Sequence, residues 1–158
     1  MGYQTDFTGS FEIEPRLTEE HQEFLVKLNE TRRMARDVGP EFGTEGEWYV
    51  DGAGPYGQDH EPNILNYNAP PSPQPNFWCQ WRPNDGGTEL VWDEGEKFYD
   101  YVEWLKYLIE SWFKPKGYKL NGRVSWMGEE RTDMGRIDVH DNTITVSKAA
   151  SVNWEVQA

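Results

Sequence analysis

The sequence has one cluster of basic side chains that could bind an anion. Arg32, Arg33 and Arg36 lie close together in a chain whose formal net charge is −13 at pH 7. A guanidinium group can hold a phosphate or a carboxylate through two parallel hydrogen bonds. Cations are also favourable at the C-terminus of a helix, where they pair with neighbouring acids. The cluster therefore supports two interpretations, an anion-binding site and a charge-stabilised helix end.

A second candidate site lies in the segment 39–76, which carries aromatic, amide and acidic side chains. This mixture is typical of a pocket for a polar ring compound such as a nucleotide or a sugar, and Trp, Tyr and Arg also concentrate at the centres of protein interfaces. A third interpretation is a lid that is only anchored to the core. We expect the segment to lie over the sheet, close to the Trp-rich stretch 77–82. The candidate ligand- or partner-binding residues are Arg32, Arg33, Arg36, Tyr56, Gln58, Asp59, Tyr67, Asn68, Gln74, Trp78, Gln80 and Trp81.

Nucleophiles and metal ligands give weaker signals. Cys79 is the only cysteine, and none of the three histidines lies near it in sequence to serve as the base that a catalytic thiolate needs. His60 and His140 lie beside acids, but neither neighbourhood has the spacing of a recognised metal site. We therefore expect a cysteine that fills the core, surface histidines, and neither a metal nor a cofactor.

Acidic residues on the two predicted helices raise two further hypotheses. Spaced carboxylates, such as those of Glu19, Glu20 and Glu23 and those in 93–103, can imitate a nucleic-acid backbone and so inhibit a DNA- or RNA-binding enzyme. A pair of carboxylates can also act as general acid and base in an enzyme. The alternative is a solvated face with acids placed to suit the helix dipole.

The element expected to position these groups is a helix within 93–118. Apolar residues recur there at the three- and four-residue steps of an α-helix and extend onto other faces, which is typical of a buried helix. The carboxylates within 93–96 would lie in its first turn, and Lys114-Pro115-Lys116-Gly117 would end it. We expect a core helix over about 96–113 that covers a sheet.

Alternating apolar residues predict the strands. A first helix is predicted to begin after an N-cap at Thr18 and to run to about Arg33. Asn121-Gly122 leaves two possibilities open, a tight hairpin or one continuous strand. Gly9 and Gly122 would lie on an apolar face, where a glycine usually marks close approach of another backbone, such as a helix that crosses both strands. The predicted strands are 3–13, 77–82, 88–92, 118–126, 135–140 and 143–147, and within the long loop only 47–50 could form a short strand.

The order of these elements predicts an α+β fold, with an antiparallel sheet of about five to six strands and two helices packed on it. We expect one domain over 1–148, in which the Gly/Pro-rich loop 39–76 folds over the body, and a weakly specified tail over 149–158. Only 36% of the residues are hydrophobic, but 15% are aromatic, and aromatic side chains bury enough area to close a core.

Charge and cysteine usage limit the partners and the compartment. A net charge of −13 argues against direct nucleic-acid binding and against an anionic membrane surface. With a single cysteine, and with no basic region followed by an apolar run at the N-terminus, a soluble cytoplasmic protein is the simplest expectation.

Five stretches of the chain carry a resemblance to a known family: FTGSFEIEP, ETRRMARD, QPNFWCQW, EKFYDYVEWLKYLIESWFKPKGYKLNG and WMGEERTDMGRIDVHDN. They resemble a family of small uncharacterised proteins found in tailed phages, prophage regions and some bacterial genomes. The resemblance covers most of the chain and implies an accessory protein of a virus or mobile element, with no activity to carry over. We therefore expect a non-enzymatic protein that binds a host or phage protein, or a small polar ligand, through an aromatic-rich cleft within 39–82. The nucleic-acid mimic and the carboxylate enzyme remain alternatives.

Overall fold

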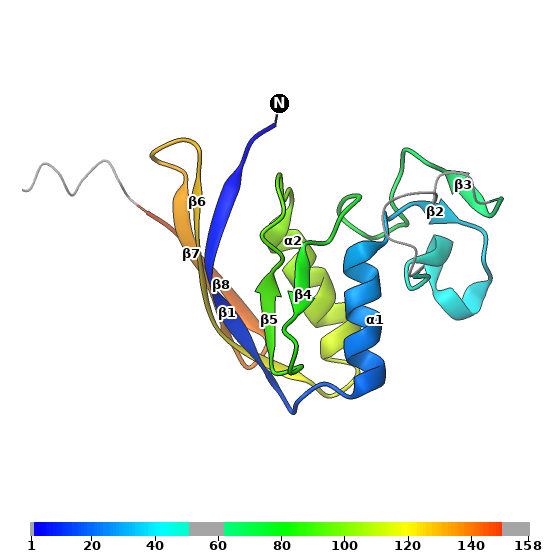
Figure 1. Ribbon diagram of the computed structural model, residues 1–158, viewed down its shortest axis with the longest axis horizontal. Helices are drawn as coiled ribbons and strands as arrows, with labels where there is room; N and C mark the ends of the chain where they lie inside the picture. The colour runs from blue at the N-terminus through cyan, green and yellow to red at the C-terminus, as the bar shows by residue number, and fades with distance from the viewer. Residues whose placement is uncertain (1, 51–61, 150–158) are drawn as a thin grey trace, which may run out of the picture.

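Figure 1 shows the computed structural model of the chain, which describes residues 2–50 and 62–149. Within these residues, six strands form one antiparallel sheet in the order β4-β5-β1-β6-β7-β8, and β2 pairs separately with β3. The predicted α+β class, with two helices and about six antiparallel strands, is confirmed. The strands are β1 (Thr5–Glu14), β2 (Ala35–Arg36), β3 (Ile64–Asn66), β4 (Trp81–Pro83), β5 (Glu89–Trp92), β6 (Lys119–Gly128), β7 (Met134–His140) and β8 (Thr143–Lys148). The helices are α1 (Glu19–Glu30) and α2 (Tyr101–Leu108), which continues as the π-helix η4 (Ile109–Phe113), and two 3-10 turns are η1 (Pro40–Phe42) and η2 (Thr44–Gly46).

The centre of the sheet is the long antiparallel pair β1 and β6. In β1, the alternating residues Phe7, Phe11 and Ile13 are buried, as a half-buried strand requires. β6 runs without a break from Lys119 to Gly128, so the prediction of one continuous strand is confirmed over the hairpin at Asn121-Gly122. Every residue of β1 has a partner in β6, which makes this pair the frame of the sheet.

Gly9 and Gly122 mark a close approach between β1 and β6 themselves. Their φ angles are 110° and 144°, and a Cβ at either position would collide with the opposite strand, at the carbonyl oxygen of Arg123 or Ser10. The predicted close approach of another backbone is therefore present. That backbone belongs to the paired strand and not to a helix, so the prediction of a crossing helix is wrong. The glycines therefore let β1 and β6 pair at this point with φ angles that other residues rarely adopt.

The buried central helix is confirmed, but it begins later than predicted. It starts at Tyr101, after Asp100 in a left-handed conformation with φ 57°, so the acids of 93–96 do not form its first turn. The Asp93 carboxylate instead accepts hydrogen bonds from the backbone N–H of Gly95 (2.7 Å) and from the side chain of Asn29 (2.8 Å). An Asx-type turn competes with helix formation, and it holds this segment as a loop.

Aromatic contacts form the core between this helix and the sheet. Phe7 of β1 lies at the centre of a cluster, with ring centroids 4.9 Å from Tyr101, 5.2 Å from Trp92, 5.6 Å from Trp81 and 5.7 Å from Phe98. Most of these pairs are edge-to-face, the arrangement that aromatic quadrupoles favour. These large rings explain how a chain with few apolar residues closes a core.

One possible strand and one predicted strand differ from the structure. Residues 47–50 form no strand, because the N–H groups of Glu47 and Tyr49 complete short helical turns with Thr44 and Gly46. The strand predicted over 77–82 is reduced to Trp81–Pro83, since the carbonyl of Phe77 accepts from the N–H of Arg33, outside the sheet. In both places the backbone groups form hydrogen bonds with partners outside a sheet, so no strand forms there.

The first helix begins as predicted and ends earlier. The Thr18 side chain accepts a hydrogen bond from the His21 N–H (3.1 Å), the N-cap that the sequence indicates. The helix ends at Glu30, because Thr31 is already extended, so the arginine cluster follows the helix and does not belong to its last turn.

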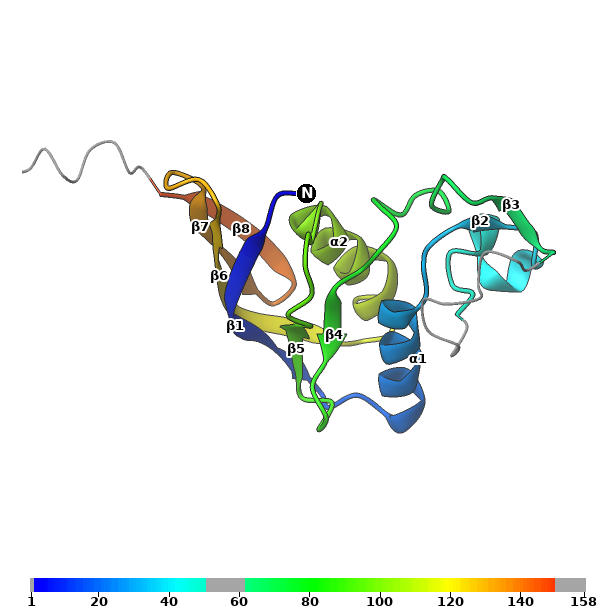
Figure 2. The same cartoon turned by 45° about the horizontal axis from the view of Figure 1, so that its top comes forward.

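The segment after this helix forms a separate small unit, which we call the lobe and define as residues 35–50 and 62–76. Figures 1 and 2 show that it lies beside α1, on the side away from the six-stranded sheet. Contrary to expectation, the described residues of this segment therefore do not fold over the sheet but lie beside the helices. The reason is Trp48, whose ring stacks on Tyr107 of α2 (5.5 Å) and contacts Phe24 of α1 (6.2 Å), so that the lobe packs on the helices.

Candidate functional site

Arg33, in the connection between α1 and the lobe, anchors the lobe to the body. It is 2% exposed, and its guanidinium donates to the Gln74 side-chain oxygen (3.0 Å) and to the backbone carbonyls of Glu47 (2.9 Å) and Gly46 (3.3 Å). Burial lowers the pKa of Arg33 to about 10, which leaves it charged at neutral pH. Because the guanidinium nitrogens of Arg33 donate to neutral acceptors of the same chain, Arg33 has a structural role and does not form an open anion-binding site.

Tyr107 joins α2 to the same network. Its hydroxyl donates to the Glu47 carboxylate (2.7 Å) and accepts from the Gln74 side-chain nitrogen (3.1 Å), which also donates to the Glu47 carbonyl (2.7 Å). Burial is the largest cause of a Tyr107 pKa raised far above its ordinary value. Each polar group in this buried contact has a partner, so the lobe is fixed to the helix by a satisfied network.

Arg32 lies between two aromatic rings. Its guanidinium carbon is 4.3 Å from the centroid of Tyr67 and 4.2 Å from that of Phe77, and one nitrogen donates to the Tyr67 carbonyl (3.3 Å). Stacked cation–π contacts of this kind hold both rings in place. The Tyr67 ring therefore has a defined orientation although it lies in a loop.

Arg36 holds the neighbouring part of the lobe. It is buried, its guanidinium stacks over Tyr49 (4.7 Å), and it donates to the Asn63 side chain (2.8 Å). Arg36 thus ties together the two stretches of the lobe on either side of residues 51–61. As with Arg33, its guanidinium is engaged by the protein itself.

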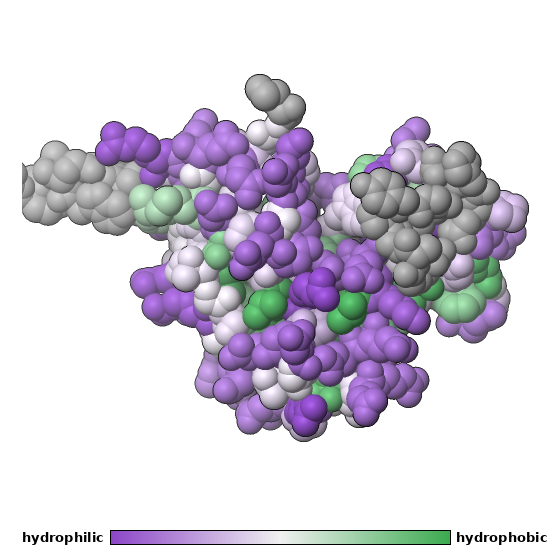
Figure 3. Space-filling view, viewed as in Figure 1, coloured by the Kyte–Doolittle hydropathy of each residue, from purple (hydrophilic) through white to green (hydrophobic). Residues whose placement is uncertain are grey.

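The outer side of the lobe exposes large apolar side chains. Leu65 is 62% exposed and Tyr67 is 42% exposed, and the exposed Asn68 follows with its N–H bonded to the Asn66 side chain (2.9 Å). We call Arg32, Leu65, Tyr67 and Asn68 the Tyr67 face. In the space-filling view the surface is mostly hydrophilic, and the hydrophobic patch at the outer end of the lobe lies over the turns η1 and η2, not over β3 (Figure 3).

The Trp-rich residues predicted to face the loop lie on the body instead. Trp81 is buried and donates its indole N–H to the Tyr101 carbonyl (2.9 Å), so it does not form the wall of an open pocket. Trp78 and Gln80 are partly buried, and the Gln80 side chain bonds to Glu96 and Trp92 near the central helix. The structure therefore brings Arg32, Arg33, Arg36, Tyr67, Asn68 and Gln74 together in and beside the lobe. Phe77, next to Trp78 in sequence, also contacts Arg32 and Arg33, whereas Trp81 lies in the core. Tyr56, Gln58 and Asp59 lie outside the described residues.

Cys79 has no geometry for catalysis. Its thiol is buried and lies 3.7 Å from the Trp81 carbonyl, to which it can donate. Burial raises the pKa of Cys79 to about 12, so the nucleophilic thiolate does not form at neutral pH. Core filling is the role that the structure supports for it.

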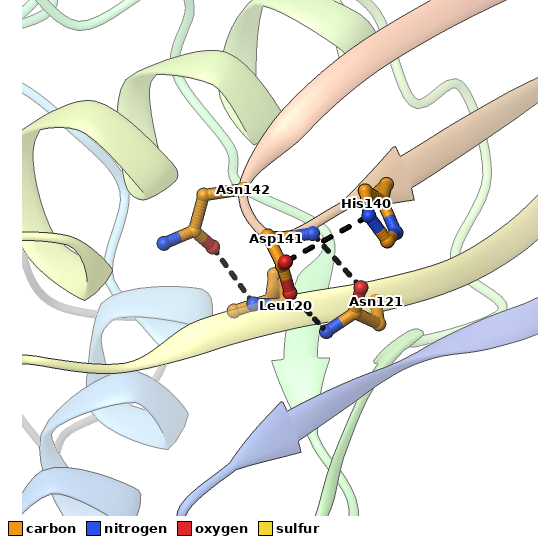
Figure 4. A network of polar contacts seen from close by, with 5 residues as sticks. All are labelled: Leu120, Asn121, His140, Asp141 and Asn142. Atoms are coloured by element: carbon orange, nitrogen blue, oxygen red, sulfur yellow. Dashed lines mark hydrogen bonds and ion pairs between the residues drawn. The ribbon is translucent and has the colours of Figure 1, made fainter.

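His140 is a surface residue at the end of β7. Its side chain is 89% exposed and lies 3.7 Å from the Asp141 carboxylate, while Asp141 and Asn142 bind the backbone and side chains of Leu120 and Asn121 (Figure 4). The turn residues Asp141 and Asn142 have left-handed φ angles of 45° and 71°, as a tight hairpin requires. The network in Figure 4 therefore clamps a hairpin turn to β6. His60 lies outside the described residues.

Two other features are absent from the described residues. Over residues 2–50 and 62–149, no three or more His, Cys, Asp or Glu side chains are grouped so that they could hold a metal ion. In the same part of the chain, no helix has the length and apolar character needed to cross a membrane.

Sequence reasoning missed several residues that build this region. Tyr107 and Glu47 complete the buried network, and Phe77 forms one side of the Arg32 stack. Tyr107 had a detectable signal, because it lies off the main apolar face of the helix and so needed a second packing partner. Leu65 had none, since its exposure follows from how the lobe folds.

Comparisons with protein-family models, with curated proteins and with solved structures found no match to this chain.

Proposed function

We propose that this chain is a non-enzymatic accessory protein that binds a partner protein through the Tyr67 face. The observation that carries the proposal is Tyr67, a residue 42% exposed to solvent whose ring stacks on the Arg32 guanidinium at 4.3 Å. Tyr and Arg are the residues that most often dominate the binding energy of protein interfaces. Leu65, 62% exposed, adds apolar area on the same segment.

The anchoring of the lobe supports this use of the surface. Binding loses free energy when loops and side chains must be ordered at the interface, so a preorganised surface binds more tightly. Here the Arg33, Gln74 and Tyr107 network orders the lobe before any partner arrives.

A partner protein fits the described surface better than a small polar ligand does. Small-molecule sites enclose most of the ligand surface, whereas the hollow beside the lobe, about 430 Å³ between Pro73, Pro75 and the outer side of α2, opens widely to solvent. The aromatic side chain that was expected to wall a closed pocket, Trp81, lies in the core. The proposal takes the partner to be a host or phage protein in the host cytoplasm, as the resemblance to phage proteins implies.

The test is a quantitative capture experiment from bacterial lysate with matched surface variants. Leu65→Asp and Tyr67→Ala remove apolar area from the Tyr67 face, while Met127→Asp changes an equally exposed residue (58%) on β6 of the body. We expect the wild type and Met127→Asp to capture the same partner, and both lobe variants to lose at least about tenfold of it, as truncated interface centres do. Equal capture by all four proteins, with unchanged thermal unfolding, would rule out the Tyr67 face.

A further inference from the structure

β8 is the outermost strand of the six-stranded sheet. It pairs with β7 along its whole length, in unbroken register from His140 opposite Thr143 to Gly135 opposite Lys148. In the part of the chain that the structure describes, no other strand pairs with its outer side. An edge of this kind presents a row of backbone donors and acceptors that another strand can use.

The alternation of the β7–β8 ladder identifies those outer groups. The Ala149 N–H donates to the Met134 carbonyl (2.9 Å), so the odd-numbered residues of this strand direct their backbone groups towards β7. In an antiparallel pair the next residues point the other way. The N–H and C=O groups of Ile144, Val146 and Lys148 therefore face outward from the sheet.

The two edges of the sheet are treated differently. The edge strand β4 has three residues, ends in Pro83, and is covered by α1, which are three common protections against pairing (Figure 1). β8 has six residues, TITVSK, of which the first four are β-branched, with no proline, no bulge and a single charge at its end. β8 therefore lacks the protections that β4 has, which indicates that β8 can pair with another strand.

Electrostatics identifies a second copy of this chain as a suitable partner for β8. The chain carries a net charge of −13, so two copies repel each other over most of their surfaces. Residues 134–148, the β7–β8 hairpin, contain Arg136 and Lys148 against Asp138 and Asp141, and are therefore neutral with His140 uncharged. This hairpin is a place where two acidic copies can approach without that repulsion.

We propose that β8 pairs antiparallel with β8 of a second copy, about a twofold axis at Thr145. In this register Ile144 lies opposite Val146 of the partner subunit, and Thr145 lies opposite Thr145 of the partner subunit. Both are favourable cross-strand pairs, and the outward groups of Ile144 and Val146 form the ladder. The same patch serves on both copies, as a twofold interface requires, and it covers Val146, which is 42% exposed in the single chain.

The first test is the mass of the protein in solution, measured by light scattering after size exclusion. We expect twice the 18.4 kDa of one chain for the wild type and for Val146→Thr, which keeps the backbone donor. Val146→Pro removes one outward donor and leaves the β7 ladder intact, so we expect a single-chain mass. A wild type that stays at the mass of one chain up to high concentration overturns the proposal.

A disulfide experiment tests the register and does not depend on the proline variant folding. Thr145→Cys places a thiol next to its symmetry copy, whereas Thr143→Cys, on the same side of the same strand, places it too far away for a disulfide. Cys79 is buried and does not compete. We expect mild oxidation to link most of the Thr145→Cys protein into dimers and little of Thr143→Cys. Equal linkage of the two variants, or none in either, contradicts the proposed pairing.

Discussion

At the scale of residues, the arginine cluster shows how far side-chain type alone can guide the interpretation. The sequence identifies Arg32, Arg33 and Arg36 as exceptional in an acidic chain. It does not show that Arg33 is buried, because its acceptors come from Gln74 and Glu47, which are distant in sequence. The helix-end interpretation is also incomplete, since these residues follow α1 and bind carbonyls, amides and rings of the lobe.

Arg33 gives a direct prediction about stability. Replacement by Met leaves the buried side-chain oxygen of Gln74 without its donor and removes one of the two donors to the Glu47 carbonyl, so we expect a loss of about 2–4 kcal/mol in the free energy of unfolding. Arg33→Lys should recover only part of it, because one ammonium group cannot reproduce the fork. Urea unfolding measures both. The exposed Arg16→Ala is the control, with a change within about 0.5 kcal/mol; an equally small effect at Arg33 would contradict the anchoring role.

Cys79 gives a prediction about pH. Burial raises its pKa from an ordinary 9.0 to about 12, so the fold favours the protonated thiol. The stability that this group contributes is therefore complete below pH 9 and is lost as the pH rises towards 12. Between pH 9 and pH 12, the free energy of unfolding measured with a chemical denaturant should fall less steeply with pH for Cys79→Ala than for the wild type. A variant with the same slope as the wild type would show that the thiol is accessible and unperturbed.

At the scale of elements, alternating apolar residues predicted the strands β1 and β6 reliably, whereas the start of the central helix was not predicted. β1 and β6 follow their alternation, and the glycines in them were recognised as positions of close approach. The start of the central helix was misplaced, because the Asp93 turn uses hydrogen bonds from Asn29, far away in sequence. The buried ring of Phe98 further holds this loop in place. Local charge preference is weak, and such tertiary contacts outweigh it.

The strand glycines can be tested by adding a single methyl group. Gly9→Ala and Gly122→Ala each place a Cβ against the backbone of the opposite strand, at φ angles that alanine rarely adopts. We expect each variant to lose about 1–3 kcal/mol or more of stability in thermal or urea unfolding. Gly86→Ala is the matched control, since its Cβ would meet only the Thr88 side chain at 3.7 Å. Stable variants at Gly9 and Gly122 would mean that the two strands do not pass so closely.

At the scale of the whole molecule, the α+β class and the antiparallel sheet could be predicted from the order of the elements. The position of the lobe could not be predicted, because it depends on the ring against which Trp48 packs. That ring belongs to Tyr107 on α2. The lobe therefore packs on the helices, while Trp81 of the Trp-rich stretch lies in the core. This arrangement leaves two separate surfaces, the Tyr67 face at one end and the β8 edge of the sheet at the other (Figure 2).

The measurement that tests the central claim most directly is hydrogen exchange on the captured complex, compared with the free protein. If the Tyr67 face binds the partner, amides within 62–77 should become more protected in the complex, whereas those of β6 should change little. Gain of protection confined to the β6–β7–β8 side, with 62–77 unchanged, would contradict the proposed function.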